Sequence, residues 1–151
     1  MKINIYTIEK KSVDEFSKII DNQKKMIQKY AQVNEIPCFS KKISSAQNRD
    51  AIMASSSYSE AFEPYLKGYN IALHPEGKEM DSFEFSEKFD ISTSLNFFIA
   101  GAYGFEDSFL KRVDSVISLS KMTFSHKIAK VILFEQIYRG LTIIHKHPYH
   151  K

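Results

Sequence analysis

The sequence contains little cysteine, no long apolar run and no large excess of one charge. Cys38 is the single cysteine among the 151 residues, so no disulfide forms within the chain, as expected in a reducing compartment. No apolar run approaches the roughly 20 residues that a membrane span needs, and the N-terminus lacks the basic and apolar regions of a secretory signal. We therefore expect a cytoplasmic protein without a membrane segment, in which Cys38 is a buried strand residue.

Length and composition predict a single compact globular domain over residues 1–151. The formal net charge of +3 at pH 7 is too small to identify a nucleic-acid partner by itself. The basic residues nevertheless concentrate in the first third of the chain, where a solvated helix surface is favoured over a dedicated basic face. These residues are Lys2, Lys10, Lys11, Lys24, Lys25, Lys29, Lys41, Lys42 and Arg49.

Apolar spacing predicts strands that alternate with helices. A capping-box spacing from Ser12 to Glu15 predicts the start of the first helix, and Pro37 is expected to stop the second strand. The other predicted elements are strands over 2–8, 33–39, 69–73, 95–100 and 116–119, a turn over 74–77, helices over 45–65 and 82–89, and a long last helix. This order is typical of an α/β domain with a mostly parallel sheet, whose ligand lies beyond the carboxyl ends of the strands.

Two segments stand where such a ligand would bind. Gly101 and Gly104 directly follow the apolar strand 95–100, and small residues there let a ligand approach bare backbone. The loop 119–125 follows the strand 116–119 and mixes apolar and hydroxyl side chains, which suits an adenine. Each segment alone is equally compatible with a purely structural turn or a loop packed for its own sake.

Three sequence blocks resemble one known family. They are SLSKMTF, the pattern H-x-x-A-K-x-x-L-x-E-Q-x-Y-R over residues 126–139, and the terminal HPYHK. In this order they resemble the SPOUT-class RNA methyltransferases that modify pseudouridine in large-subunit ribosomal RNA, the ribosomal large subunit methyltransferase H family. The resemblance extends along the whole chain and implies a trefoil-knotted α/β fold, a homodimer, and methylation of N3 of a pseudouridine in 23S rRNA within the ribosome.

The resemblance also implies a site for S-adenosyl-L-methionine. The expected cofactor-binding residues are Leu73, Ala100, Gly101, Leu119, Ser120, Lys121, Met122, Thr123 and Phe124. The chain departs from the family pattern at Ala100, at His74, where an acidic residue is frequent, and at Ser125, where proline is usual.

The polar C-terminal tail is expected to serve the RNA. It lies beyond the last apolar helix, has no evident core to join, and carries groups that bind phosphate or stack on bases. The resemblance implies that Tyr149 and His150 are catalytic. It implies that His126, Arg139, His147 and Lys151 bind substrate. An ion pair of Arg139 with Glu135 and simple packing of His126 remain open alternatives.

The clustered histidines do not favour a metal site, because no cysteine lies near them and Pro148 interrupts the segment. Two other functions remain open: a non-catalytic RNA-binding module that has lost cofactor binding, and a flavodoxin-like nucleotide-binding protein. The second is disfavoured because Thr7-Ile8-Glu9-Lys10 stands where a phosphate-binding glycine loop would follow the first strand.

Overall fold

The computed structural model describes residues 1–151 and places five strands in one sheet. The strand order is β2-β1-β4-β3-β5 and every neighbouring pair is parallel, which confirms the predicted sheet. The strands are β1 (Lys2–Ile8), β2 (Gln32–Cys38), β3 (Tyr69–Glu79), β4 (Ser94–Ile99) and β5 (Ser115–Ser118). The helices are α1 (Glu15–Ile27), α2 (Lys41–Gln47), α3 (Ala51–Phe62), α4 (Ser82–Ser86), α5 (Asp107–Leu110) and α6 (His126–Ile144), with 3-10 turns η1 (Glu63–Tyr65) and η2 (Glu87–Asp90).

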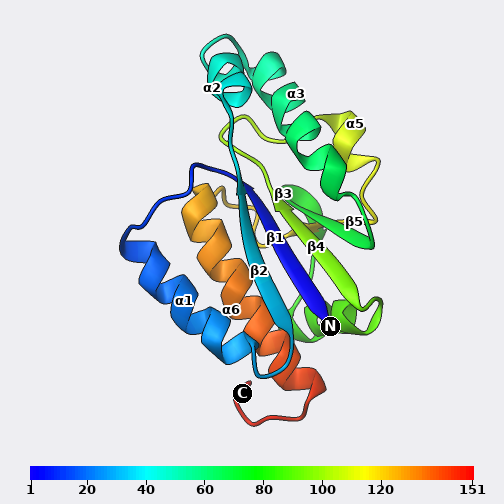
Figure 1. The fold of residues 1–151 in the computed structure, drawn as a ribbon. Coiled ribbons are helices and arrows are strands. Elements are labelled where there is room, and N and C mark those ends of the chain that lie inside the picture. The colour runs from blue at the N-terminus through cyan, green and yellow to red at the C-terminus, as the bar shows by residue number, and fades with distance from the viewer.

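Helices cover both faces of the sheet and make two hydrophobic cores (Figure 1). The strand residues alternate between them: Phe97 packs with α1, α4 and α6, whereas Phe98 packs with α3 and α5. β4 is buried on both sides from Leu95 to Ile99, as expected for a central parallel strand. No helix is both long enough and apolar enough to span a membrane.

A ladder of buried asparagines crosses four strands. Asn34 donates to Asn4 (2.9 Å), Asn4 donates to Asn96 (2.9 Å), and Asn96 donates to Asn70 (3.0 Å). These residues are also register partners in the sheet. Because a buried amide without a partner is costly, the ladder favours this one register over a shifted pairing.

The structure contradicts two predicted helix boundaries. α1 is capped by Asp14, which forms a capping box with Ser17, so the spacing from Ser12 to Glu15 is not the cap. The single helix predicted over 45–65 is two helices, because Asp50 accepts a hydrogen bond from the N–H of Met53 and starts α3 anew.

One predicted strand end is wrong, that of β3, whereas the second strand ends close to Pro37 as expected. β2 continues through Pro37 to Cys38, where it pairs with β1. Gln32 donates its N–H to the carbonyl of Met1, directly before β1. The N–H groups of alternate residues in a parallel strand point to opposite sides, so the nitrogen of Pro37, five residues later, faces the open edge of the sheet. β3 runs on to Glu79, and the predicted turn 74–77 is a bulge within it, between Leu73 and Lys78. Cys38 is in a strand as predicted but is only half-buried.

Candidate functional site

The bulge of β3 and the loops that follow β4 and β5 meet at one edge of the sheet and enclose a pocket of about 630 Å³. This volume is in the range of small-molecule sites, roughly 300–1,000 Å³. The bulge contributes Leu73 to Pro75, the end of β4 and its loop contribute Ile99 to Phe105, and the loop after β5 contributes Leu119 to Ser125 except Lys121. His126 and Ala129 in the first turn of α6 close the pocket. Segments that are distant in the sequence therefore share one ligand-sized space.

Eight of the nine residues predicted to bind a cofactor line this pocket. They are Leu73, Ala100, Gly101, Leu119, Ser120, Met122, Thr123 and Phe124. Lys121 does not line it: its side chain is 83% exposed and its ammonium lies 3.9 Å from Glu79. The lining residues that sequence reasoning missed include Pro75, Ile99, Phe105 and Ala129. Ala129 lies one helical turn after His126, a spacing that could have identified it.

The two glycines after β4 have different physical roles. A Cβ atom on Gly101 would lie 2.6 Å from the hydroxyl oxygen of Tyr58, so packing against α3 requires glycine there, whatever the pocket holds. Gly104 has a φ of +73° and open space around it, and its N–H donates to Gly101 to close a turn. The left-handed backbone explains glycine at position 104.

The loop after β5 is shaped by its own hydroxyl groups. The Ser118 hydroxyl donates to the carbonyl of Ser120, and the Ser120 hydroxyl accepts from the N–H of Met122. Thr123 and Phe124 donate no backbone hydrogen bond to another backbone group, so their N–H groups can bind a ligand. Ser125, at the position where proline is usual in the family, has a φ of −60° and caps α6; this φ matches the value that proline fixes.

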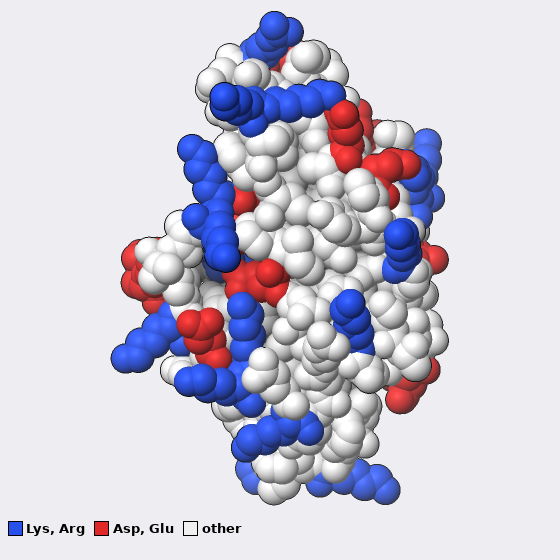
Figure 2. Space-filling view, in the orientation of Figure 1, with Lys and Arg blue, Asp and Glu red and all other residues white.

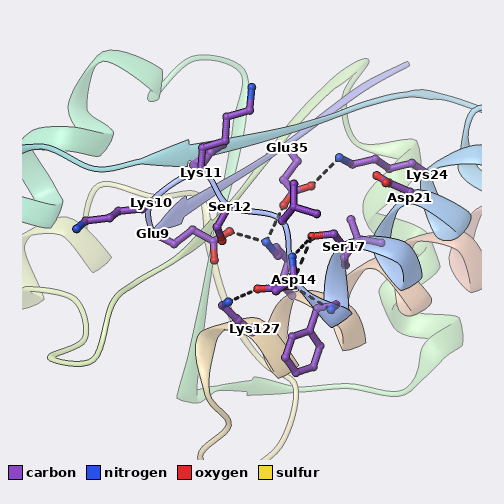
Figure 3. A pocket seen from close by; sticks show the side chains of 15 residues that line it. Glu9, Lys10, Lys11, Ser12, Asp14, Ser17, Asp21, Lys24, Glu35 and Lys127 are labelled. Carbon is purple, nitrogen blue, oxygen red and sulfur yellow. Dashed lines mark hydrogen bonds and ion pairs between the residues drawn. The ribbon is translucent and has the colours of Figure 1, made fainter.

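His126 connects the pocket wall to a chain of buried charges. Its Nε2 lies 3.2 Å from a carboxylate oxygen of Glu9, without the geometry of a hydrogen bond. Glu9 and Glu35 both bind Lys130, and Lys24 binds Glu35 at 2.6 Å. Figure 3 shows Glu9, Glu35 and Lys24 of this network beside the segment that joins β1 to α1.

The network holds its groups in their charged forms. Burial would raise the pKa of Glu9, but the contacts with His126 and Lys130 outweigh it and lower the pKa to about 2. Burial would lower the pKa of Lys130, but hydrogen bonds to Glu35 and Glu9 raise it instead. The network contains three cations and three anions, so it offers no net charge to a ligand. Its ion pairs fix α6 against β1 and β2. The six residues are Lys24, Lys127, Lys130, Glu9, Asp14 and Glu35.

The C-terminal tail lies at the far end of α6 from the pocket. Helix α6 has 19 residues, so the tail begins roughly 28 Å from His126 at 1.5 Å per residue. The expectation that the tail has no core to join is wrong. Tyr149 packs against Tyr138 with ring centres 4.7 Å apart, and its hydroxyl reaches Glu135 at 3.3 Å.

Arg139 holds the tail in place. Its guanidinium pairs with Glu135 at 2.5 Å, which confirms the ion pair considered from the spacing. It also lies 5.0 Å from the ring centre of Tyr149 and 3.2 Å from Nδ1 of His150. Of the residues predicted to act on substrate, His126 is therefore in the pocket, whereas Arg139, His147, Tyr149, His150 and Lys151 do not line it.

The histidines of the tail turn to different partners. His145 Nδ1 contacts the carbonyl of Leu141, His147 Nδ1 accepts from the N–H of Tyr149, and His150 lies edge-on to Phe83. No group of three or more potential metal ligands converges anywhere in the structure.

Comparison with known proteins agrees with this arrangement. A family model described as "Predicted SPOUT methyltransferase" matches residues 1–150. The chain is 50% identical over 151 residues to "Ribosomal RNA large subunit methyltransferase H" of Aliarcobacter butzleri (strain RM4018). It is 49% identical over 153 residues to the protein of that name from Sulfurovum sp. (strain NBC37-1). Each alignment covers 100% of both chains. The protein of that name from Campylobacter lari is 48% identical over its full length. The chain belongs to the SPOUT methyltransferase family.

Proposed function

We propose that this protein transfers a methyl group from S-adenosylmethionine to N3 of a pseudouridine in 23S rRNA of the assembled ribosome. The proposal rests on one observation: eight residues predicted for the cofactor, drawn from three separate segments of the chain, line a single pocket at one edge of the sheet. The name shared by the full-length relatives supports ribosomal RNA as substrate. Action on ribosomes places the protein in the cytoplasm.

The chemistry of the pocket fits this cofactor. No lysine, arginine, aspartate or glutamate lines it, so no fixed cation opposes the positive sulfonium. Apolar side chains such as Leu73 and Phe124 suit the adenine faces, and the free N–H groups of Thr123 and Phe124 suit its edge nitrogens. When bound, S-adenosylmethionine supplies an already activated methyl group, so the chain needs to align the acceptor and assist loss of the N3 proton.

The distance between tail and pocket leads us to propose a homodimer. Tyr149 and His150 lie too far from their own pocket to act there, so in the proposed dimer the tail of one subunit serves the pocket of the other. α6 offers a surface for this contact, because Ile128, Ile132 and Ile143 remain partly exposed along it. In the proposed site Tyr149 and His150 seat the nucleotide and handle the N3 proton, while Arg139 positions both rings.

Calorimetry with S-adenosylmethionine tests the cofactor site. Ala129→Phe should fill the pocket and abolish binding, while the same change at the exposed Ala51 of α3 serves as the matched control. Wild-type protein that binds ribosomes but not S-adenosylmethionine would instead support the non-catalytic RNA-binding module. Equal affinity of Ala129→Phe and wild type would exclude this pocket as the cofactor site.

Mixed dimers test the sharing of the site. Ala129→Phe and a chain lacking Tyr149 to Lys151 should each be inactive on ribosomes as homodimers. Co-expressed with different tags, the mixed dimer keeps one intact pocket and one intact tail in the composite site, so about half of the wild-type activity should return. No recovery would show that pocket and tail of the same chain work together.

A further inference from the structure

A basic hollow lies beyond the carboxyl ends of β1 and β2, outside the cofactor pocket. It has a volume of about 410 Å³ and is lined by Lys10, Lys11, Lys41, Phe39, Ser40 and Ser44. Figure 2 shows basic side chains gathered over α2 and over the segment that joins β1 to α1. No carboxylate lines this hollow, so its lining carries three positive charges and two hydroxyl groups.

The three lysines of this basic hollow are not neutralised within the protein. Lys10, Lys11 and Lys41 are exposed, and none of them is among the nine ion pairs of the chain. Lys42 differs, because it pairs with Glu60 at 2.5 Å. The ammonium of Lys10 lies over the ring of Phe39, 5.2 Å from its centre. This cation–π contact leaves the hydrogen-bond donors of the ammonium free.

The segment that carries Lys10 and Lys11 is anchored at both ends. Glu9 binds Lys130 and Asp14 binds Lys127, so two acidic residues of the segment are turned toward α6. Figure 3 shows Lys10 and Lys11 extending away from this network. A fixed backbone that presents free lysines binds an anionic chain with less loss of conformational freedom than a mobile loop.

The basic hollow and the cofactor pocket share one edge of the sheet. β1 and β4 are parallel neighbours, so the segments that follow them start side by side. Glu9 contacts His126 of the pocket wall, and Lys10 is the next residue along the chain. RNA whose target base enters the pocket would therefore pass its backbone close to these lysines.

We infer that Lys10, Lys11 and Lys41 bind backbone phosphates of ribosomal RNA next to the target nucleotide. The inference rests on the proposed function and adds a substrate surface to it. Lysine ammonium groups and serine hydroxyls are common phosphate partners in nucleic-acid complexes, and they fix the position of the strand without reading its sequence. Binding through them releases counterions and is therefore sensitive to salt.

The test compares two triple variants with the same loss of charge. K10Q/K11Q/K41Q removes the charges of the basic hollow, and K18Q/K25Q/K29Q removes three exposed, unpaired lysines in and just after α1 as the control. Affinity for ribosomes and for protein-free 23S rRNA is measured across salt concentrations, together with calorimetry for S-adenosylmethionine. The first triple should bind both RNA probes at least about tenfold more weakly at low salt, with a salt slope smaller by about two to three. Cofactor affinity should not change.

Three results would overturn the inference. Equal weakening by both triples would show that only total charge matters, and unchanged affinity of K10Q/K11Q/K41Q would remove the basic hollow from the RNA path. A defect on ribosomes but not on protein-free 23S rRNA would assign these lysines to a ribosomal protein. Failure of the wild type to bind S-adenosylmethionine is a separate outcome, because it contradicts the proposed function while the RNA measurements still decide the role of the lysines.

Discussion

The hydroxyl oxygen of Tyr58 occupies the place that a side chain on Gly101 would need. A Cβ atom at residue 101 would stand 2.6 Å from this oxygen and 2.7 Å from the adjoining ring carbon, and the same hydroxyl donates to Gln47 at 2.6 Å. A glycine of the proposed cofactor site is thus tied to the packing of α3 and to the last residue of α2.

Gly101→Ala should destabilise the protein by about 1–3 kcal/mol through overpacking. Urea unfolding measures the loss, and Tyr58→Leu in the same background should recover part of it because the phenol ring is gone. The two changes should therefore be non-additive in a double-mutant cycle. Strict additivity, or a loss too small to measure for Gly101→Ala alone, would contradict the contact.

Asn96→Ala should break the asparagine ladder at its centre. Asn96 is 2% exposed, and its removal leaves the amide nitrogen of Asn4 and the amide oxygen of Asn70 each without the partner that Asn96 provides, at a cost of roughly 1–3 kcal/mol for each unpaired group. Asn34→Ala at the end of the ladder leaves one amide short of a partner and should cost less. Equal free energies of unfolding for the two variants would show that the ladder does not act as a unit.

Glu9→Gln should reduce stability in a pH-dependent way. The folded pKa of Glu9 is about 2, below the ordinary value of 4.5, so its contribution is complete above about pH 5 and is lost as pH falls toward 2. The side chain is 10% exposed, so the difference from wild type near neutral pH should be about 3 kcal/mol. Urea unfolding between pH 3 and pH 7 gives this difference; one that stays constant across the range would argue against the charged network.

Cys38 should react slowly in the native protein. Burial raises the pKa of its thiol to about 11, so only about one thiol in a thousand is ionised at pH 8. Labelling by a thiol reagent should speed up about tenfold per pH unit and should be much faster in urea. Native and unfolded protein that label at the same rate would show that the thiol is not protected.

Local patterns predicted most elements because their apolar spacing agrees with the packing they adopt. Leu95 to Ile99 form a strand buried on both faces, as their continuous apolar run indicates. The order of strands depends on contacts between distant residues, such as Asn4 with Asn96 across 92 positions, and no local pattern shows these. The break before α3 was missed because the apolar spacing continues through it, although Asp50 carries the signal as a cap.

The pocket was better predicted than the substrate end. Its lining comes from loops that directly follow strands, and the carboxyl ends of parallel strands meet at one edge, so chain position and family pattern identify most of it. The position of the tail was not predicted, because the tail packs back onto side chains of α6. Tyr149 meets Glu135 and Tyr138 after the chain reverses beyond Ile144, and composition alone does not show this reversal.

Pro37 has a consequence for how copies of this chain meet. It lies on β2 at the border of the sheet, with its nitrogen directed outward, so a strand arriving from another molecule finds one donor missing near the carboxyl end of that border. The opposite border, β5, is only four residues long. Neither border therefore favours growth of the sheet into a continuous fibre, and association between folded copies is left to the helical faces.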